Sequence, residues 1–187
     1  KVETPAITRL TGVGKLPYDG NVTPDGRHYL AGLFGEDGVV HVDMWRSPLK
    51  AERILDRYGH GEEPLPVYKM PHLQSWAFTA GQYALPAVGR HEVLWVDRET
   101  QAQVASTPVH GQPVFIIAQP ASPFVWVNFA TPLNDVVQVI DSRSHQVVAT
   151  LNPGKAILHM EFAPRGAEVW ISSRDDNQVL IYDTRTR

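Results

Sequence analysis

The sequence predicts an all-β protein that is built from a repeated four-stranded unit, and three observations support this prediction. Apolar residues occur in short runs that alternate as half-buried strands do. The 15 prolines and 14 glycines separate these runs. A hydrophobic residue followed by Asp recurs at the end of one run in each unit. No stretch shows a helical period over the ~10 residues that a helix needs.

The predicted strands are rich in Val, Ile, Trp, Tyr and Phe, the residues that favour a pleated sheet, and Gly, Pro, Asp and Asn bound them. The clearest runs cover residues 28–34, 39–43, 92–97, 114–118, 125–130, 136–141, 169–173 and 178–183.

The repeat of these runs identifies the fold. The terminal aspartates are Asp43, Asp97, Asp141 and Asp183, at intervals of 54, 44 and 42 residues. A Pro/Gly turn opens the second strand of each unit, at residues 23–26, 79–81, 119–122 and 163–166. Four antiparallel strands in ~40–50 residues are typical of a β-propeller blade. A β-sandwich, the alternative, would not repeat its turn and its Asp at matched positions.

We therefore predict one partial β-propeller domain over residues 1–187, with blades at about 14–58, 67–107, 110–151 and 154–187. The fourth unit reaches Arg187 just after its third strand, so we expect its outer strand to come from elsewhere. Pairing between the first and last blades normally hides the sheet edges of a propeller. We expect a missing half of the ring, a second chain or a swapped dimer to cover them here.

Composition excludes several classes of function. The net charge is −3 and the pI about 6.2, which does not favour nucleic-acid binding. The absence of cysteine excludes disulfides, thiolate zinc sites, cysteine nucleophiles and covalently attached c-type haem. No His-x₃-His spacing indicates a metal site, and no apolar run reaches the ~18 residues of a membrane span.

Candidate functional residues lie just before the innermost strand of each unit, because in a propeller these loops surround the central channel. Three of the four units carry a histidine at or near this level, and a ring of imidazoles can bind a metal or move protons. The alternative for each is a hydrogen-bonded or solvated loop residue. The candidates are Lys15, Tyr18, Asp19 and Asn21, then Met70, His72, Gln74 and Trp76, then His110 and Gln112, and finally Lys155, His159 and Glu161. Trp76, Trp126 and Trp170 are expected to pack between blades, and Trp76 alone is near enough to a channel entry to stack on a flat ligand.

Specific segments resemble the haem d1 propeller domain that cytochrome cd1 nitrite reductases share with haem d1 biosynthesis proteins. They are PYDGNVTPDGRHYLAGLFGEDGVVHVD from residue 17, MPHLQSW from 70, VWVNFATPLN from 125 and HMEFAPRGAEVWISS from 159. The likeness spans all four units in order, and it implies the last four blades, or C-terminal half, of an eight-bladed ring. PYDGNVTPDGR and VWVNFATPLN look most similar to the NirF type of biosynthesis protein.

The resemblance also implies roles for two residues. In the reductases two distal histidines lie over the haem and help to bind and protonate nitrite. Tyr18 stands at the position of one, and His72 matches the other. A phenol with its usual pKa of ~10 is a poor proton-donor partner beside an imidazole, which disfavours nitrite reduction. The proximal iron-ligating histidine of the family falls in the other half of the ring, so we assign that role to no residue of this sequence.

The resemblance implies a periplasmic protein that acts late in haem d1 assembly. It would bind haem d1 or dihydro-haem d1 non-covalently in the channel mouth, and either dehydrogenate a propionate side chain or hold and pass on the intermediate. Tyr18 and His72 would be catalytic. The ligand-binding residues would be Lys15, Asp19, Trp76, His110, Lys155, His159 and Arg174, with the basic ones contacting carboxylates. Other maturation proteins and the nitrite reductase are the expected protein partners.

Two other functions stay open at this point. One is a propeller scaffold for protein partners, without a tetrapyrrole. The other is the haem d1 domain of a nitrite reductase, against which Tyr18 and the absence of a Cys-x-x-Cys-His motif both argue.

Overall fold

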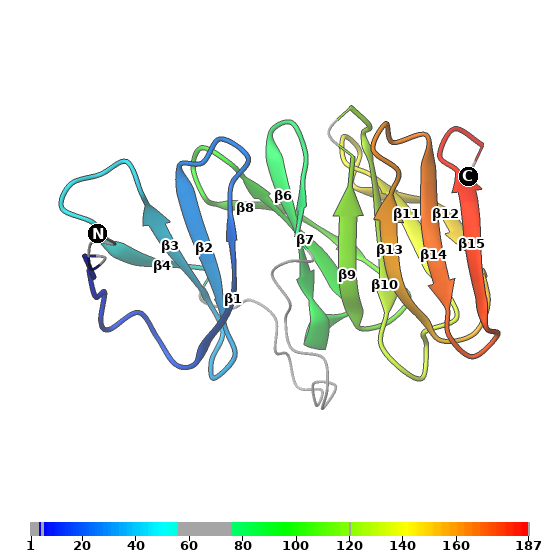
Figure 1. Cartoon of the computed structure of the whole chain (residues 1–187), viewed down its shortest axis with the longest axis horizontal. Coiled ribbons are helices and arrows are strands. Elements are labelled where there is room, and N and C mark those ends of the chain that lie inside the picture. Colours follow the sequence, from blue (N-terminus) through cyan, green and yellow to red (C-terminus); the bar gives the residue numbers. More distant parts are fainter. Residues whose placement is uncertain (1–3, 5, 56–75, 120, 187) are drawn as a thin grey trace.

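The structure is a computed structural model that describes residues 4, 6–55, 76–119 and 121–186. These residues form four antiparallel sheets that follow one another along the chain. The sheets stand side by side in a row, with the sheet of residues 17–54 at one end and that of residues 157–183 at the other (Figure 1). Apart from the short turn η2 (Val88–Arg90), all regular elements of the described residues are strands, so the predicted all-β fold is confirmed.

Each sheet is a meander in which consecutive strands pair. Sheet A contains β1 (Pro17–Val22), β2 (His28–Leu33), β3 (Val39–Asp43) and β4 (Ala51–Ile54). Sheet B contains β5 (Ala77–Phe78), β6 (Gln82–Ala87), β7 (Glu92–Asp97) and β8 (Gln103–Pro108). Sheet C contains β9 (Pro113–Ala118), β10 (Phe124–Phe129), β11 (Val137–Asp141) and β12 (Gln146–Leu151). Sheet D contains β13 (Ile157–Phe162), β14 (Glu168–Ser173) and β15 (Gln178–Asp183).

Neighbouring sheets pack face to face through three apolar clusters. The first joins sheets A and B and includes Leu30 and Leu85. The second joins sheets B and C through Trp95 and Val127, and the third joins sheets C and D. Since alternate residues of a strand point to opposite faces, each inner sheet supplies side chains to two clusters. This packing of successive meanders is the arrangement of propeller blades.

The recurrent Asp at the end of the third strand caps the turn that follows it. Asp43, Asp97, Asp141 and Asp183 each accept a hydrogen bond from the backbone N–H two residues later, at 2.8–3.1 Å. A short carboxylate side chain that bonds its own backbone in this way stabilises a tight turn. The Asp recurs in the sequence because each blade uses the same side-chain-to-backbone hydrogen bond in the turn after its third strand.

A β-bulge interrupts the first strand of sheets A, C and D at the same place. The pairs that flank it are Pro17↔Leu33 and Gly20↔Ala31 in sheet A, Pro113↔Phe129 and Ile116↔Val127 in sheet C, and Ile157↔Ser173 and Met160↔Ile171 in sheet D. Two residues of the first strand thus oppose one residue of the second. Such a bulge bends the strand and changes the direction of the side chains at that point.

Candidate functional site

The rim is the end of the sheets at which β1, β9 and β13 begin, and it is formed by residues 14–19, 110–115 and 154–159. These strands are the first of their sheets, and they lie towards the viewer in Figure 1. Most of the candidate residues predicted from the sequence lie on this rim. His72, Met70 and Gln74 lie outside the described residues.

The backbones of Lys15 in sheet A and Lys155 in sheet D make equivalent hydrogen bonds. The N–H of Lys15 donates to Oε1 of Glu36 at 2.8 Å, and the N–H of Lys155 donates to Oδ2 of Asp176 at 2.7 Å. The carbonyl of Lys15 accepts a hydrogen bond from the N–H of Gly35, which precedes Glu36. In the same way, the carbonyl of Lys155 accepts one from the N–H of Asp175, which precedes Asp176. Both lysines are exposed. Because their backbones are fixed alike, their ammonium groups are presented from equivalent positions of two different blades.

The backbone around each lysine is left-handed on both sides. The preceding Gly14 and Gly154 have φ of +120° and +158°, and the following Leu16 and Ala156 have φ of 50° and 54°. Glycine adopts the first conformation without the steric penalty that a Cβ would bring. The turn therefore requires the glycine that precedes the lysine in both segments.

In sheet D the structure brings Lys155 and Arg174 to one part of the rim. The N–H of Arg174 donates to the carbonyl of Ala156, which follows Lys155. Nε of Arg174 bonds Oδ1 of Asp175 at 2.7 Å, and this pair lowers the pKa of the Asp175 carboxyl. The Lys155 N–H, followed by the hydroxyl of Ser173, likewise lowers the pKa of Asp176. The two carboxylates stay ionised and hold the loop of residues 174–176 beside Lys155.

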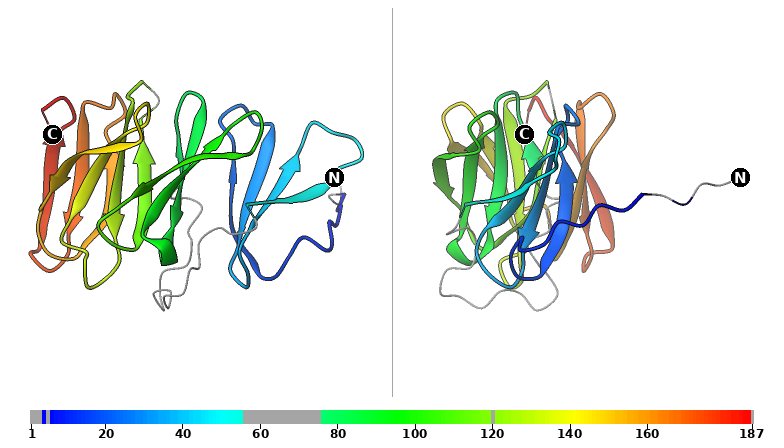
Figure 2. Two further views of the ribbon diagram at one scale, coloured as in Figure 1. Left: turned by 180° about the vertical axis from the view of Figure 1, so that it is seen from behind. Right: turned by 90° about the vertical axis from the view of Figure 1, so that its left-hand side faces the viewer.

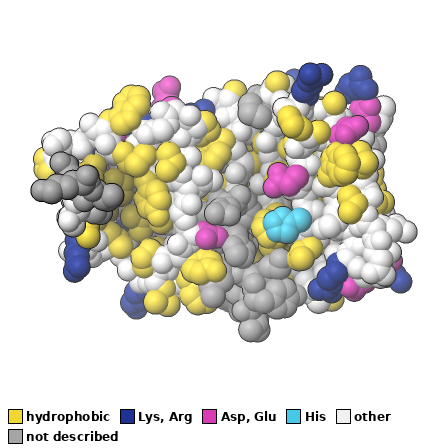
Figure 3. All heavy atoms as spheres, viewed as in Figure 1, with side chains coloured by type: hydrophobic (Ala, Val, Ile, Leu, Met, Phe, Trp, Pro, Cys, Tyr) yellow, Lys and Arg dark blue, Asp and Glu magenta, His cyan; other side chains and the backbone are white. Residues whose placement is uncertain are grey.

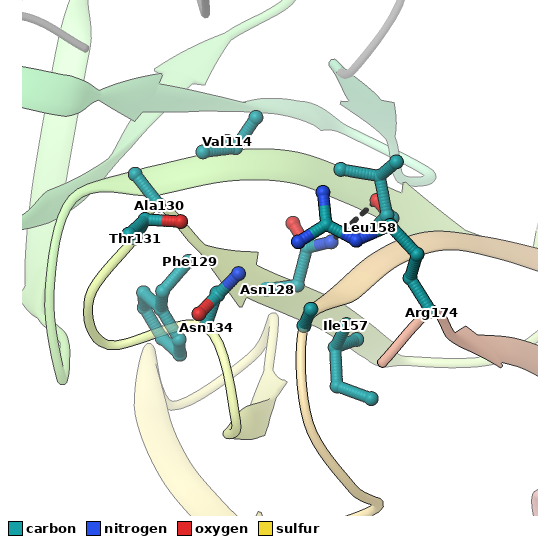
Figure 4. A pocket seen from close by; sticks show the side chains of 10 residues that line it. Val114, Asn128, Phe129, Ala130, Thr131, Asn134, Ile157, Leu158 and Arg174 are labelled. Atoms are coloured by element: carbon teal, nitrogen blue, oxygen red, sulfur yellow. Dashed lines mark hydrogen bonds between the residues drawn. The ribbon is translucent and has the colours of Figure 1, made fainter. Parts of the chain in front are cut away.

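Arg174 also lines a cavity of about 30 Å³ between sheets C and D (Figure 4). Figure 4 shows its guanidinium directed into the space between Val114 and Leu158. The amide of Asn128 lies below, and its Nδ2 donates to the carbonyl of Leu158 at 2.8 Å. The cavity has room for about one water molecule, so it is not itself a tetrapyrrole pocket.

The bulges of sheets A, C and D contain one residue each at an equivalent position, namely Asp19, Phe115 and His159. The His159 ring lies 4.6 Å from that of Phe115, at 36° between planes. A side chain of the second strand fixes two of these bulges: Asn128 Oδ1 accepts the N–H of Phe115, and Ser172 Oγ accepts that of His159. Neither Asn128 nor Ser172 was predicted as a site residue, although Asn128 is a polar residue in an otherwise apolar strand.

The remaining predicted residues have different surroundings. Tyr18 is exposed beside Phe34, with ring centroids 6.5 Å apart. His110 is exposed, and its ring meets Phe129 edge-on at 5.5 Å. Figure 3 shows, on the face of the molecule seen in Figure 1, a histidine side chain next to hydrophobic and acidic ones.

Trp76 differs from the expectation of a ring placed to stack on a ligand at the rim. Only 4% of it is exposed, and it packs in the core between sheets A and B. It borders a hollow of about 430 Å³ at the opposite end of the first strands, together with Phe78, Ile117, Arg98 and Glu161. Its Nε1 has no hydrogen-bond partner among the described residues.

Two further features are absent from residues 4, 6–55, 76–119 and 121–186. In this part of the chain no group of three or more His, Asp or Glu side chains is placed to hold a metal ion. None of its helices has the length and apolar character that a membrane span requires.

Comparisons with known proteins agree with this geometry. The family model of the cytochrome D1 heme domain matches residues 1–187. Protein NirF of Stutzerimonas stutzeri is 51% identical over 182 residues, and protein NirF of Pseudomonas aeruginosa 50% over 181. Each alignment covers 97% of this chain and 46% of the relative, so the chain spans about half the length of the curated relatives it matches.

Solved structures share the fold at lower identity. The dihydro-heme d1 dehydrogenase NirN, solved in complex with DHE, superposes with a TM-score of 0.69 at 22% identity, over 92% of this chain and 36% of NirN. Hydrazine synthase of Kuenenia stuttgartiensis superposes with a TM-score of 0.69 at 16% identity, over 100% and 50%. These likenesses establish the β-propeller fold. Together with the full-length family match and the identity to NirF, they show that the chain belongs to the cytochrome D1 heme domain family and is of the NirF type.

Proposed function

We propose that this chain binds a late tetrapyrrole precursor of haem d1, non-covalently, at the rim and in the mouth of the propeller channel. Membership of a heme-domain family and the identity to NirF support a role related to haem d1 biosynthesis. The observation that carries the proposal is the matched presentation of Lys15 and Lys155 from two blades. A flat macrocycle with acidic substituents needs cations at separated points around its edge.

The described residues fit such a ligand chemically. Lys15, Lys155 and Arg174 would contact its carboxylates, because charge-assisted hydrogen bonds to carboxylates are the stronger ones. The ring pair of His159 and Phe115 offers a flat, partly apolar surface beside the basic group. A bound tetrapyrrole would supply the iron and the conjugated ring. The protein's part is to bind it, to orient its acidic edge and to present proton-transfer groups.

Two versions of the activity differ in chemistry. As a carrier, the chain holds the precursor and releases it unchanged. As a dehydrogenase, it removes two hydrogens from adjacent carbons of a propionate side chain, giving an acrylate. One hydrogen leaves as a proton, and the other leaves with the electron pair to a two-electron acceptor such as a quinone or a flavin. Tyr18 is the described member of the proton-transfer pair in this version, and His72 is its proposed partner.

The proposal also includes the setting of the reaction. The chain would act in the periplasm, together with other haem d1 maturation proteins and the nitrite reductase. Fractionation of cells that produce the tagged protein tests the location. Co-purification with those proteins in the presence and absence of the tetrapyrrole tests the partners.

The binding experiment is a titration of the 187-residue chain with dihydro-haem d1, followed by visible absorption. We expect a spectral shift with a dissociation constant that rises about tenfold in Lys15→Gln or Lys155→Gln, the effect of losing one charge-assisted bond. Lys50→Gln is the matched control, since Lys50 is exposed on the edge of sheet A and pairs only weakly with Glu52. Esterifying the propionates should remove the difference between wild type and the lysine variants.

An unchanged spectrum at saturating ligand would refute the proposal. Equal affinities in the wild type, the lysine variants and Lys50→Gln would refute the assigned contacts. For the dehydrogenase version, the readout is the mass of the ligand after incubation with a quinone or flavin acceptor. Loss of two hydrogens in the wild type but not in Tyr18→Phe, with binding retained in both, would distinguish catalysis from carriage.

A further inference from the structure

Three polar residues of the segment VWVNFATPLN line the cavity of about 30 Å³ between sheets C and D. Asn128 lies on β10, and Thr131 and Asn134 lie in the turn between β10 and β11. Sheet D, which stands next to sheet C in Figure 2 as in Figure 1, supplies the fourth polar side chain, that of Arg174. Figure 4 shows Thr131 and Asn134 on one side of this space and Arg174 on the other. Polar groups from two blades therefore meet at one point of the rim.

The cavity is rich in hydrogen-bond donors. Backbone groups of sheets C and D engage Oδ1 and Nδ2 of Asn128, which fixes the orientation of this amide and uses one of its two N–H groups. The hydroxyl of Thr131 and the amide of Asn134 have no hydrogen-bond partner among the described residues. Nε of Arg174 is bonded to Asp175, and Figure 4 shows the rest of the guanidinium directed into the space. Since no Asp or Glu is among the described residues that line the cavity, a negatively charged acceptor is what it lacks.

Buried apolar side chains form the other walls of the cavity. Val114, Phe129 and Ile157 are 3%, 2% and 1% exposed, and they line it together with Leu158. In such surroundings a hydrogen bond to a charged group is stronger than in water, because the local dielectric constant is low. These donors therefore favour an ionised acceptor more than the same donors would on an open surface.

Backbone hydrogen bonds hold these donors in place across the two sheets. The N–H of Ile157, the first residue of β13, donates to the carbonyl of Asn134 at 2.7 Å. The N–H of Arg174 donates to the carbonyl of Ala156 at 3.2 Å. The cavity nevertheless opens to the rim, since Thr131 is exposed and the Arg174 side chain is 66% exposed. A ligand group can therefore enter without the reordering of side chains and loops that weakens binding.

We propose that this cavity is a subsite for a single carboxylate group. One oxygen of the carboxylate enters the space among Arg174, Thr131 and Asn134, and the other oxygen stays at the opening. The space has room for about one water molecule, which suits one oxygen atom and excludes a ring. The planar guanidinium forms strong, charge-assisted hydrogen bonds with carboxylates. A tetrahedral anion such as sulfate brings further oxygens for which this space has no room.

Two sources of a carboxylate share this chemistry. One is an acidic side chain of a tetrapyrrole held at the rim, and the other is a small free carboxylate such as formate or acetate. The first source rests on the proposed function, for which it names the contact of one acidic substituent. The second source does not rest on it. Acetate alone tests the subsite, and the tetrapyrrole then tests the first source.

The first experiment is a titration of the isotope-labelled 187-residue chain with sodium acetate, followed by NMR through the side-chain N–H signals of Asn128 and Asn134. We expect saturable shifts with a dissociation constant of ~1–10 mM, and no saturation with sodium sulfate at equal ionic strength. Arg174→Gln should raise the dissociation constant at least about tenfold, and Thr131→Val about fivefold. Thr150→Val, the matched change at an exposed residue of β12, should leave it unchanged. Far-UV circular dichroism verifies that each variant folds.

The second experiment repeats the dihydro-haem d1 titration in saturating acetate. If an acidic side chain of the ring occupies the subsite, acetate raises the apparent dissociation constant of the ring in the wild type and much less in Arg174→Gln. Acetate that binds without competing would overturn the tetrapyrrole as the source. Acetate binding by a chain that does not shift the tetrapyrrole spectrum would support the subsite while the proposed function fails.

Three results would overturn the subsite itself. They are side-chain amide signals that acetate does not shift, an equal response to sulfate, and equal acetate affinities in the wild type, Arg174→Gln and Thr131→Val. Each of these would show that the cavity holds water only, whatever the tetrapyrrole does.

Discussion

The imidazoles of His28 and His41 are joined by a 2.8 Å contact between Nδ1 of His28 and Nε2 of His41. They lie on the adjacent strands β2 and β3, and His41 is only 8% exposed. At this distance one nitrogen must donate and the other accept, so the pair cannot carry a proton on both facing nitrogens. Burial first, and then the neighbouring His28, lowers the pKa of His41.

This pair predicts a loss of stability in mild acid. His41 stays neutral in the folded chain below the pH at which an unfolded histidine, with a pKa of ~6.5, takes up a proton. The unfolded state then binds more protons, so stability falls as the pH drops below ~6.5. Glu52, Asp43 and Arg27 also act on His41, the two carboxylates opposing the shift and Arg27 adding to it.

The measurement is urea unfolding of the wild type and His41→Gln at pH 7.5 and 5.0. We expect the wild type to lose more stability between the two than the variant does. His110→Gln serves as the control, because His110 is exposed and outside the core. If the wild type and His41→Gln lost equal stability on acidification, this account of the pair would be wrong.

The four turn-capping aspartates predict a second transition at lower pH. Asp43, Asp141 and Asp183 have pKa values of about 2, held down chiefly by Arg27, Arg143 and Arg185. Their contribution is complete above the unfolded pKa of ~3.9 and is lost as the pH falls towards 2. Asp43→Asn with Asp141→Asn should flatten the stability curve between pH 4 and 2. The exposed Asp135→Asn should not, and a parallel curve for the double variant would contradict the assignment.

We expect the loss of the buried Asn128 amide to lower the stability of the chain strongly. Its side chain bonds the N–H of Phe115 and the carbonyl of Leu158, so it links β9 and β10 to sheet D. Asn128→Ala leaves both backbone groups without partners, which should cost about 2–4 kcal/mol of unfolding free energy. Ser172→Ala, the same position in the more exposed sheet D, should cost about 1 kcal/mol or less. Similar losses for both would show that burial does not set the cost.

We expect the loss of the Thr107 hydroxyl to lower stability and to shift the fluorescence of Trp95. The Thr107 hydroxyl accepts from Nε1 of Trp95 at 2.8 Å and donates to the carbonyl of His145 at 2.7 Å. Thr107→Val keeps the shape but leaves both buried groups unpaired, at a cost of about 1–3 kcal/mol. The exposed Thr150→Val should change stability by less than about 0.5 kcal/mol. An unshifted emission maximum with wild-type stability in Thr107→Val would contradict this reading of the bond.

The sequence was sufficient to predict the strands, because period-two patterns and turn residues act locally. The runs at 39–43, 92–97 and 178–183 are the observed strands β3, β7 and β15. The bulges were not predictable in this way, since they depend on the register between two strands. Trp76 packs between blades, as its apolar ring predicts, but position before an inner strand does not determine which face a side chain occupies, so the sequence could not decide between this packing and a ring that faces a ligand.

The hydrogen bond that holds a bulge has a consequence for which residues evolution can place at that position of the rim. In sheets C and D the bond that holds the bulge comes from the second strand, through Asn128 or Ser172, and it ends on a backbone N–H. The side chain at the bulge itself takes no part in that bond. Asp19, Phe115 and His159, an acid, an aromatic and a base, occupy this one structural position. The residue type at this position can therefore differ from blade to blade without a change in the backbone bond that holds the bulge.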